Sequence, residues 1–391
     1  MHEKITQSEV VLLIEQYLTE NFEMRYNVLN NKIEVRERKE EATSFRPLTE
    51  KVTNSIIRRI KIELEEATNV KQNVMEYINS EDICMYNPIR DYLMNLPEWD
   101  GQNRVAELFG RIPGITAEQI YWLSIWMRSA VAHWLGMDTL HGNECVPTLI
   151  GSQGCGKSTF WRRILPPTLR QYFLDHINLG NKFDKDMALS NNLLVNLDEL
   201  DQIKPSQQAE MKHTVSKVKV NGRPIYGRSQ DDRDRYASFV ATTNNLHPLS
   251  DPTGSRRYIC VRIPDGLLID NETDIDYEQF YAQLIYEVKE KEMRYWFTNE
   301  ETNAIQTANA PFQHEVDLGT MLTTCFRLPE VGEKATPMLT KQIVEELTTQ
   351  FPTVKKDISF SVRVGKELNK LGFERKLLHR GIVYNVVRNA Q

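Results

Sequence analysis

A glycine-rich run with one lysine and two hydroxyl side chains follows a short apolar segment, 146–150, and leads into an amphipathic stretch, 160–165. This is the G-x-x-x-x-G-K-[ST] pattern in the strand, turn and helix context that phosphate binding requires. The glycines let successive N–H groups converge on one anion, and the start of the helix adds partial positive charge. The run consists of Gly151, Ser152, Gln153, Gly154, Cys155, Gly156, Lys157, Ser158 and Thr159.

Two side chains of this run have a direct chemical role. Lys157 can reach the β- and γ-phosphates of a nucleotide as a point charge, and the Ser158 hydroxyl can join the octahedral shell of a Mg²⁺ ion that keeps several waters. We therefore predict that residues 151–159 bind ATP with Mg²⁺, that Ser158 is a metal ligand and that Lys157 also takes part in catalysis.

Two carboxylates follow a second apolar segment, 192–197. In a P-loop ATPase the first acid after such a strand holds Mg²⁺ through a water, and the second polarises the water that attacks the γ-phosphate. We predict these roles for Asp198 and Glu199 respectively. An Asp-Glu pair is a weak signal alone, and it gains meaning from the glycine-rich run upstream.

A third apolar segment, 236–243, ends at Asn244, and a turn further on carries two arginines. A neutral amide such as that of Asn244 can orient the attacking water without repelling the γ-phosphate. Arg256 or Arg257 can reach a nucleotide held by a neighbouring subunit and neutralise charge in the transition state. The sequence does not decide between these two arginines, and a structural ion pair is the alternative.

The most basic part of this region is 211–228, where Val218 and Val220 alternate with polar residues. The Asn221-Gly222 pair is a strong turn signal, so a projecting hairpin or loop is expected. Its cations can contact the phosphates of a DNA strand, although the three aspartates that follow also allow an internally paired surface. The predicted DNA-binding residues are Lys217, Lys219, Arg223 and Arg228.

The two ends of the chain have a different character. Residues 1–86 combine helical patterns with one hairpin pattern, which predicts a small α+β accessory domain. Residues 311–391 predict a linker followed by two helices and a hairpin, the order of a winged helix. Such a module contacts either DNA or protein. The intervening residues, 87–310, include a tryptophan-rich helix that we expect to pack in the core, with exposed base stacking as the alternative.

The composition is that of a soluble chain long enough for two or three domains, with 391 residues, a net charge of −6 and 40% hydrophobic residues. The five cysteines show no C-x-x-C spacing, so neither a zinc ribbon nor a disulfide framework is indicated. No apolar run approaches the ~20 residues of a membrane span, and the N-terminus lacks the apolar core of a signal peptide. We expect a cytoplasmic protein without a membrane partner.

Taken in order, these motifs resemble the virulence-associated protein E family, P-loop ATPases of phages and mobile elements that are similar to superfamily 3 helicases of the AAA+ class. The resemblance covers roughly 87–263 and includes an upstream Trp99-Asp100-Gly101. It implies a three-layer α/β core, a homo-oligomeric ring, expected to be a hexamer, with shared nucleotide sites, and work in DNA replication. A single strand or fork would be the DNA, and any priming would need a separate primase or replicase.

The leading hypothesis is therefore a Mg-ATP-dependent DNA helicase or translocase. A nucleotide-dependent loader or switch that binds DNA or a replication protein without translocating is the alternative. A small-molecule kinase is a third possibility, against which the arginine turn and the basic hairpin argue.

Overall fold

The computed structural model describes residues 6–38, 44–137, 142–177, 180–200, 211, 213–222, 231–249, 255–313, 318–330, 332–351, 354, 360–378 and 381–389. The chain divides into two compact units, one formed by 1–246 with 256–308 and the other by 247–255 with 309–391. Among the described residues, no helix has both the length and the apolar character that crossing a bilayer requires.

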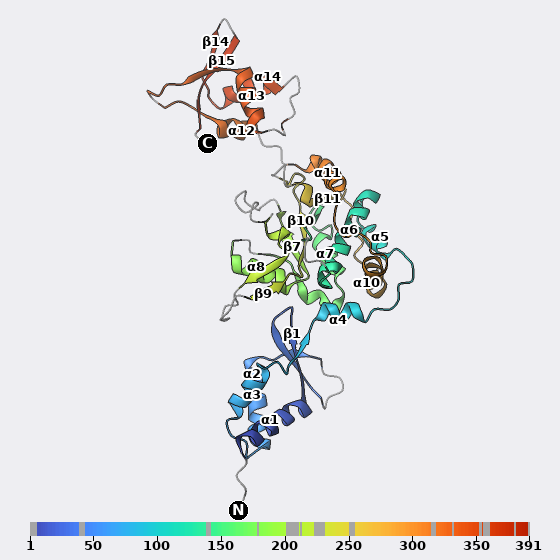
Figure 1. Cartoon of the computed structure of the whole chain (residues 1–391). Helices are drawn as coiled ribbons and strands as arrows, with labels where there is room; N and C mark the ends of the chain where they lie inside the picture. The colour runs from blue at the N-terminus through green and yellow to red at the C-terminus, as the bar shows by residue number, and fades with distance from the viewer. Residues whose placement is uncertain are drawn as a thin grey trace, which may run out of the picture. The chain divides into compact units, whose positions relative to one another are not determined.

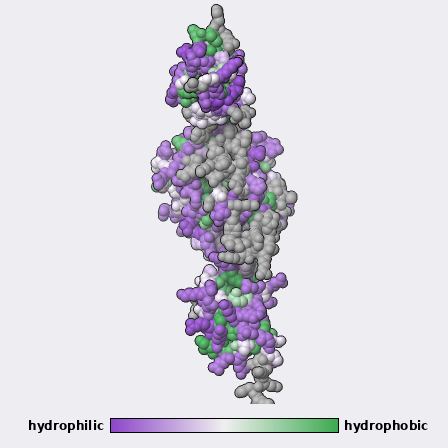
Figure 2. Space-filling model, turned by 90° about the vertical axis from the view of Figure 1, so that its left-hand side faces the viewer, coloured by the Kyte–Doolittle hydropathy of each residue, from purple (hydrophilic) through white to green (hydrophobic). Residues whose placement is uncertain are grey.

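The N-terminal part of the first unit is a four-stranded sheet in the order β3-β2-β1-β4 with three helices. Thr6 and Thr49 cap two of these helices through their hydroxyls, and the sheet and helices share a hydrophobic cluster of their own. Figure 2 shows apolar side chains gathered among polar ones on this part of the chain. The elements are α1 (Gln7–Asn21), β1 (Phe22–Asn27), β2 (Lys32–Glu37), β3 (Arg46–Pro47), α2 (Glu50–Glu63), α3 (Val70–Ile78) and β4 (Cys84–Tyr86).

The centre of the first unit is a five-stranded parallel sheet in the order β11-β5-β10-β7-β6 (Figure 1). Every residue of β5 and of β10 is buried, which is why neither sequence alternates strictly between apolar and polar residues. The predicted mixed α/β fold with a parallel sheet is confirmed. The strands are β5 (Val146–Ile150), β6 (Phe173–Leu174), β7 (Leu194–Asp198), β10 (Ser238–Thr243) and β11 (Tyr258–Arg262).

Helices pack against this sheet and form one hydrophobic cluster with it. In the longest helix Trp122, Trp126 and Trp134 are all buried, so they belong to the core and form no exposed stacking surface. The Trp126 ring lies 6.2 Å from the ring of Trp161 in the helix after the glycine run. The helices are α4 (Pro88–Met94), α5 (Arg104–Phe109), α6 (Ala117–Trp134), α7 (Lys157–Ile164), α8 (Lys182–Asn191), α10 (Tyr277–Ile285) and α11 (Asn299–Ala308).

A separate two-stranded sheet joins β8 (Lys219–Gly222) to β9 (Asp231–Asp234). Asn221 pairs with Asp232 and Gly222 with Asp231, so the expectation of a turn at Asn221-Gly222 is wrong. Cross-strand pairing keeps both residues in the strand, and the residues between the two strands, 223–230, lie outside the described residues.

The second unit contains helices and a sheet in which β15 pairs with β12, β13 and β14. Its own hydrophobic cluster includes Leu322, Phe326, Ile343 and Val364. The two predicted helices and the hairpin correspond to α13, α14 and β14–β15, whereas α12 was not expected from the sequence. The elements are α12 (Leu318–Cys325), β12 (Phe326–Arg327), β13 (Thr336–Leu339), α13 (Thr340–Gln350), α14 (Phe360–Lys370), β14 (Arg375–Leu378) and β15 (Gly381–Arg388).

Candidate nucleotide-binding site

The strand order brings three of the predicted site segments to one edge of the parallel sheet. β10 lies between β5 and β7, with Thr243 paired to Ile150 and Thr242 paired to Asp198. Because the carboxyl ends of parallel strands meet at the same edge, the glycine-rich run after β5, Asn244 after β10 and Asp198 at the end of β7 are neighbours.

The glycine-rich turn depends on its glycines at two positions. Gly154 and Gly156 have φ angles of +83° and +90°, which side chains with a Cβ rarely adopt. A Cβ on Gly156 would also lie 2.4 Å from the Asn271 amide nitrogen, whereas nothing lies within 4 Å of one on Gly154. Gly156 is the N-cap of α7 and offers no capping side chain, so the first N–H groups of this helix are available to an anion.

The Lys157 ammonium is the centre of the turn. It donates to the carbonyl oxygens of Gly151 and Ser152, both at 2.8 Å, and to Asn244 Oδ1 at 2.9 Å. Its side chain is buried, and its nitrogen lies 3.7 Å from the buried Cys155 sulfur. No described carboxylate pairs with this cation, so neutral oxygens hold it where a phosphate can take their place. The other residues of the turn are exposed or half-buried: Ser152, Gln153, Gly154, Gly156, Ser158 and Thr159.

The two acids are exposed at the end of β7. Asp198 Oδ1 accepts a hydrogen bond of 2.6 Å from the buried Thr242 hydroxyl, which in turn accepts one from Asn196 at 3.4 Å. Glu199 has a φ of +52°, and strained backbone of this kind gathers at functional sites. Sequence reasoning missed Thr242, whose role depends on the pairing of β10 with β7.

Arg256 and Arg257 lie at the opposite edge of the sheet. Tyr258, the next residue, pairs with Val146 at the amino end of β5, whereas the glycine-rich run follows the carboxyl end. Arg257 Nη2 is 3.9 Å from a Glu144 carboxylate oxygen, and Arg256 is exposed. The fold therefore separates both arginines from the glycine-rich run of the same chain by the length of β5.

A model of the virulence-associated protein E-like domain matches residues 93–314, more than half of the chain. The chain belongs to this family. The resemblance drawn from the motifs is thereby confirmed, and the VapE-like domain extends beyond residue 263 to include α10 and α11. No curated protein matches the sequence.

Solved structures of the NrS-1 C terminal region are similar to the whole chain. The apo structure of residues 305–718 of that protein has 11% sequence identity and a TM-score of 0.48, and the similarity covers 98% of this chain and 100% of that one. Its A form has 12% identity and a TM-score of 0.47, with 97% and 100% covered. These scores are too low to support an argument about function.

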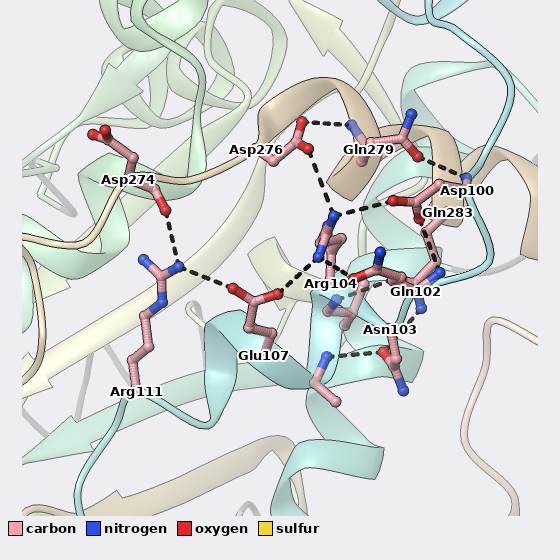
Figure 3. A network of polar contacts seen from close by, with 12 residues as sticks. Asp100, Gln102, Asn103, Arg104, Glu107, Arg111, Asp274, Asp276, Gln279 and Gln283 are labelled. Carbon is pink, nitrogen blue, oxygen red and sulfur yellow. Dashed lines mark hydrogen bonds and ion pairs between the residues drawn. The ribbon is translucent and has the colours of Figure 1, made fainter.

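Within the VapE-like domain, the connection after β11 supports the glycine-rich turn. The Ile269 N–H donates to the Cys155 carbonyl and the Asn271 amide donates to the Gly156 carbonyl, both at 3.0 Å. Arg111 holds the same connection by donating to the carbonyl oxygens of Thr273 at 2.8 Å and Asp274 at 3.0 Å. Figure 3 shows the contact with Asp274. None of these contacts could be read from the sequence, because they join segments far apart in the chain.

Arg104 links the same connection to the Trp99-Asp100-Gly101 motif (Figure 3). Its guanidinium lies 3.0 Å from Asp100, 3.3 Å from Glu107 and 3.8 Å from Asp276, and Asp276 caps α10. The motif that resembled the family in sequence therefore holds a helix and a connection in place rather than contributing a reactive group.

The predicted DNA-binding residues fall into three situations. Lys217 pairs with Asp186 at 2.8 Å. Lys219 is exposed on β8 opposite Asp234 in register. Arg223 and Arg228 lie outside the described residues. Beneath the hairpin, Arg235 donates to the Val215 and Lys217 carbonyl oxygens, and burial lowers its pKa to about 10.

Proposed function

We propose that the chain is a Mg-ATP-dependent ATPase that translocates on or unwinds DNA during replication of a phage or mobile element. The observation that carries the proposal is the 2.9 Å contact between the Lys157 ammonium and Asn244, beside a carboxylate on the adjacent strand. A mobile cation, a neutral amide and an acid at one sheet edge are the groups that phosphoryl transfer needs.

The residues of this edge fit Mg-ATP. The turn has open space at Gly154. Asp198 is exposed, its first carboxylate oxygen is oriented by Thr242, and its second oxygen has no partner among the residues that the structure describes. Bound Mg-ATP supplies the phosphoryl group and most of the cationic charge around it. Ser158 and Asp198 would hold the metal, Lys157 would neutralise the phosphates, Asn244 would orient a water and Glu199 would accept its proton.

In this proposal, the arginines of one subunit act on the nucleotide bound by another. Because they lie one strand length from the turn of their own chain, a guanidinium can act only on a nucleotide bound by a neighbour in a ring, which we expect to be hexameric. Arg256 is the better candidate, since it is exposed and Arg257 faces Glu144.

Unwinding and ATP hydrolysis by the purified chain on forked DNA test the proposal. A translocase hydrolyses ATP faster as the single strand lengthens, and it separates the fork. Stimulation that saturates on short strands, without unwinding, would instead establish a loader or switch. Phosphoryl transfer to a metabolite without any response to DNA would contradict both.

A further inference from the structure

A cavity of about 810 Å³ lies in the first unit, away from the glycine-rich turn. It is lined by residues of β1 and the turn after it, of β4 and α4, of the end of α8 and of β9. Its volume is within the range of small-ligand sites. The lining residues that matter here are Tyr26, Tyr86, Tyr236, Arg90, Arg233 and Ser190.

Contacts with neighbouring residues hold the aromatic lining of the cavity in place. The Tyr26 hydroxyl donates to Asn31 Oδ1 at 3.1 Å, and Tyr236 accepts from the Asn87 amide at 3.1 Å. The Arg25 guanidinium lies 3.4 Å from the centroid of the Tyr86 ring. Burial raises the pKa of Tyr86 and of Tyr236. These aromatic rings are thus held in fixed positions, which suits the stacking of bases.

The two arginines of the lining form no ion pair with the residues that the structure describes. Arg90 is exposed on α4 and forms no ion pair with any residue that the structure describes. Arg233 donates to Met187 Sδ at 3.5 Å and forms no ion pair with a carboxylate in the described part of the chain. Asp91 and Asp234 also line the cavity, so the two guanidiniums are balanced by two carboxylates.

Ser190 gives an independent sign that something else completes this site. Only 3% of the residue is exposed, and its hydroxyl has no hydrogen-bond partner in the part of the chain that is described. Buried hydroxyls are normally satisfied. Rotation of the Ser190 side chain towards the cavity would let an oxygen or nitrogen of a ligand satisfy this hydroxyl.

We propose that this cavity binds unpaired nucleotides of a single DNA strand, with bases against the tyrosines and backbone phosphates at Arg90 and Arg233. A single strand carries one charge per nucleotide, so each guanidinium can pair with one phosphate even though the charges of the lining balance. A free nucleoside triphosphate concentrates several charges and needs a lining with net positive charge. The inference deepens the proposed function, because it assigns a place on the chain to the DNA on which that function acts.

The test is the binding of a fluorescently labelled oligothymidylate of about 20 nucleotides, followed by anisotropy on the full chain without ATP. We expect Arg90→Ala to weaken binding about tenfold and to reduce the slope of log Kd against log salt by about one. Arg58→Ala is the matched control, because Arg58 is also exposed and forms no ion pair within the described residues; it should change Kd less than about twofold. Ser190→Ala should weaken binding less than Arg90→Ala does.

Wild-type affinity in both Arg90→Ala and Arg233→Ala would overturn the proposal, as would a wild type that binds only free thymidine nucleotide. This failure is separable from that of the proposed function. If the wild type hydrolyses ATP but Arg90→Ala binds DNA normally, only the cavity is wrongly assigned. If Arg90→Ala loses DNA binding while the wild type shows no ATPase activity, the assignment of the cavity is supported and the proposed ATPase function is contradicted.

Discussion

The central sheet has a carboxyl edge, where its parallel strands end, and an amino edge, where they begin, and these two edges are built differently. At the carboxyl edge, Lys157 and Asn244 are in contact at 2.9 Å and Thr242 holds Asp198 at 2.6 Å. At the amino edge, Arg256 is exposed, and Arg257 lies 3.9 Å from Glu144, its one ion pair within the described residues. The groups of the carboxyl edge are thus organised within one chain, whereas the amino edge leaves the Arg256 guanidinium exposed.

This difference teaches how the chemistry would be divided between subunits. A preorganised site has its polar groups already bonded before the reaction begins. The carboxyl edge meets that description, because Lys157, Asn244, Thr242 and Asp198 are already hydrogen-bonded. Glu199, beside them, is also held at a positive φ. The amino edge does not, so its contribution should appear only on assembly. Substitutions at the carboxyl edge should therefore impair each chain by itself, and those at the amino edge should be rescued by a partner.

The largest effect is expected for Lys157→Ala. No other described cation contacts Asn244, so nothing can take over the phosphate contact, and ATP turnover should fall by about 100-fold or more. Steady-state phosphate release measures it. Lys219→Ala, which removes an exposed lysine of β8, is the control and should leave turnover without DNA unchanged. Similar turnover in both variants would show that the glycine-rich turn takes no part in ATP hydrolysis.

Glu199→Gln should separate binding from hydrolysis. The amide keeps the shape of the side chain but cannot accept a proton, so turnover should fall about 100-fold while nucleotide affinity is retained. Titration with a fluorescent ATP analogue, alongside phosphate release, measures the two effects. Glu272→Gln, on an exposed residue, should change neither. Loss of affinity together with turnover would show that Glu199 supports the fold of the edge instead.

Thr242→Val should have an intermediate effect, through Asp198. A hydrogen bond to a charged group contributes about 1.5–3 kcal/mol, so the Mg²⁺ concentration needed for half-maximal activity should rise about tenfold or more. Thr148→Val is matched, since Thr148 is also buried in the sheet but donates to the Val146 carbonyl. An equal shift in both variants would indicate general loosening of the sheet.

The smallest effect concerns stability beside the amino edge, where α11 lies near β11. Hydrogen bonds from Arg294 lower the pKa of Glu301 to about 2. This pair therefore stabilises the fold above the ordinary carboxyl pKa and is lost as pH falls from about 4.5 towards 2. Glu301→Gln should lower Tm by about 2–4 °C at pH 7, with a difference from wild type that shrinks across that window. Glu290→Gln, on an exposed residue, should leave Tm unchanged.

The sequence predicts the carboxyl edge better than its surroundings. Buried parallel strands read as continuous apolar runs, so Asp198 and Asn244 could be placed at strand ends without coordinates. Thr242 could not, because its contact depends on the register between β10 and β7. Asn221-Gly222 misled because cross-strand pairing overrides local turn preference. Arg111 and Asn271 support the turn from remote segments, and a single sequence carries no signal of such contacts.

Mixing two inactive proteins tests the central claim most directly. Lys157→Ala protein retains Arg256, and Arg256→Ala protein retains the complete carboxyl edge. If rings assemble at random, about a quarter of the interfaces in an equimolar mixture would pair an intact turn with an intact arginine. We predict that ATP turnover in the mixture recovers to about that fraction of wild type. No recovery, from proteins shown to co-assemble, would contradict the division of the site between the two edges.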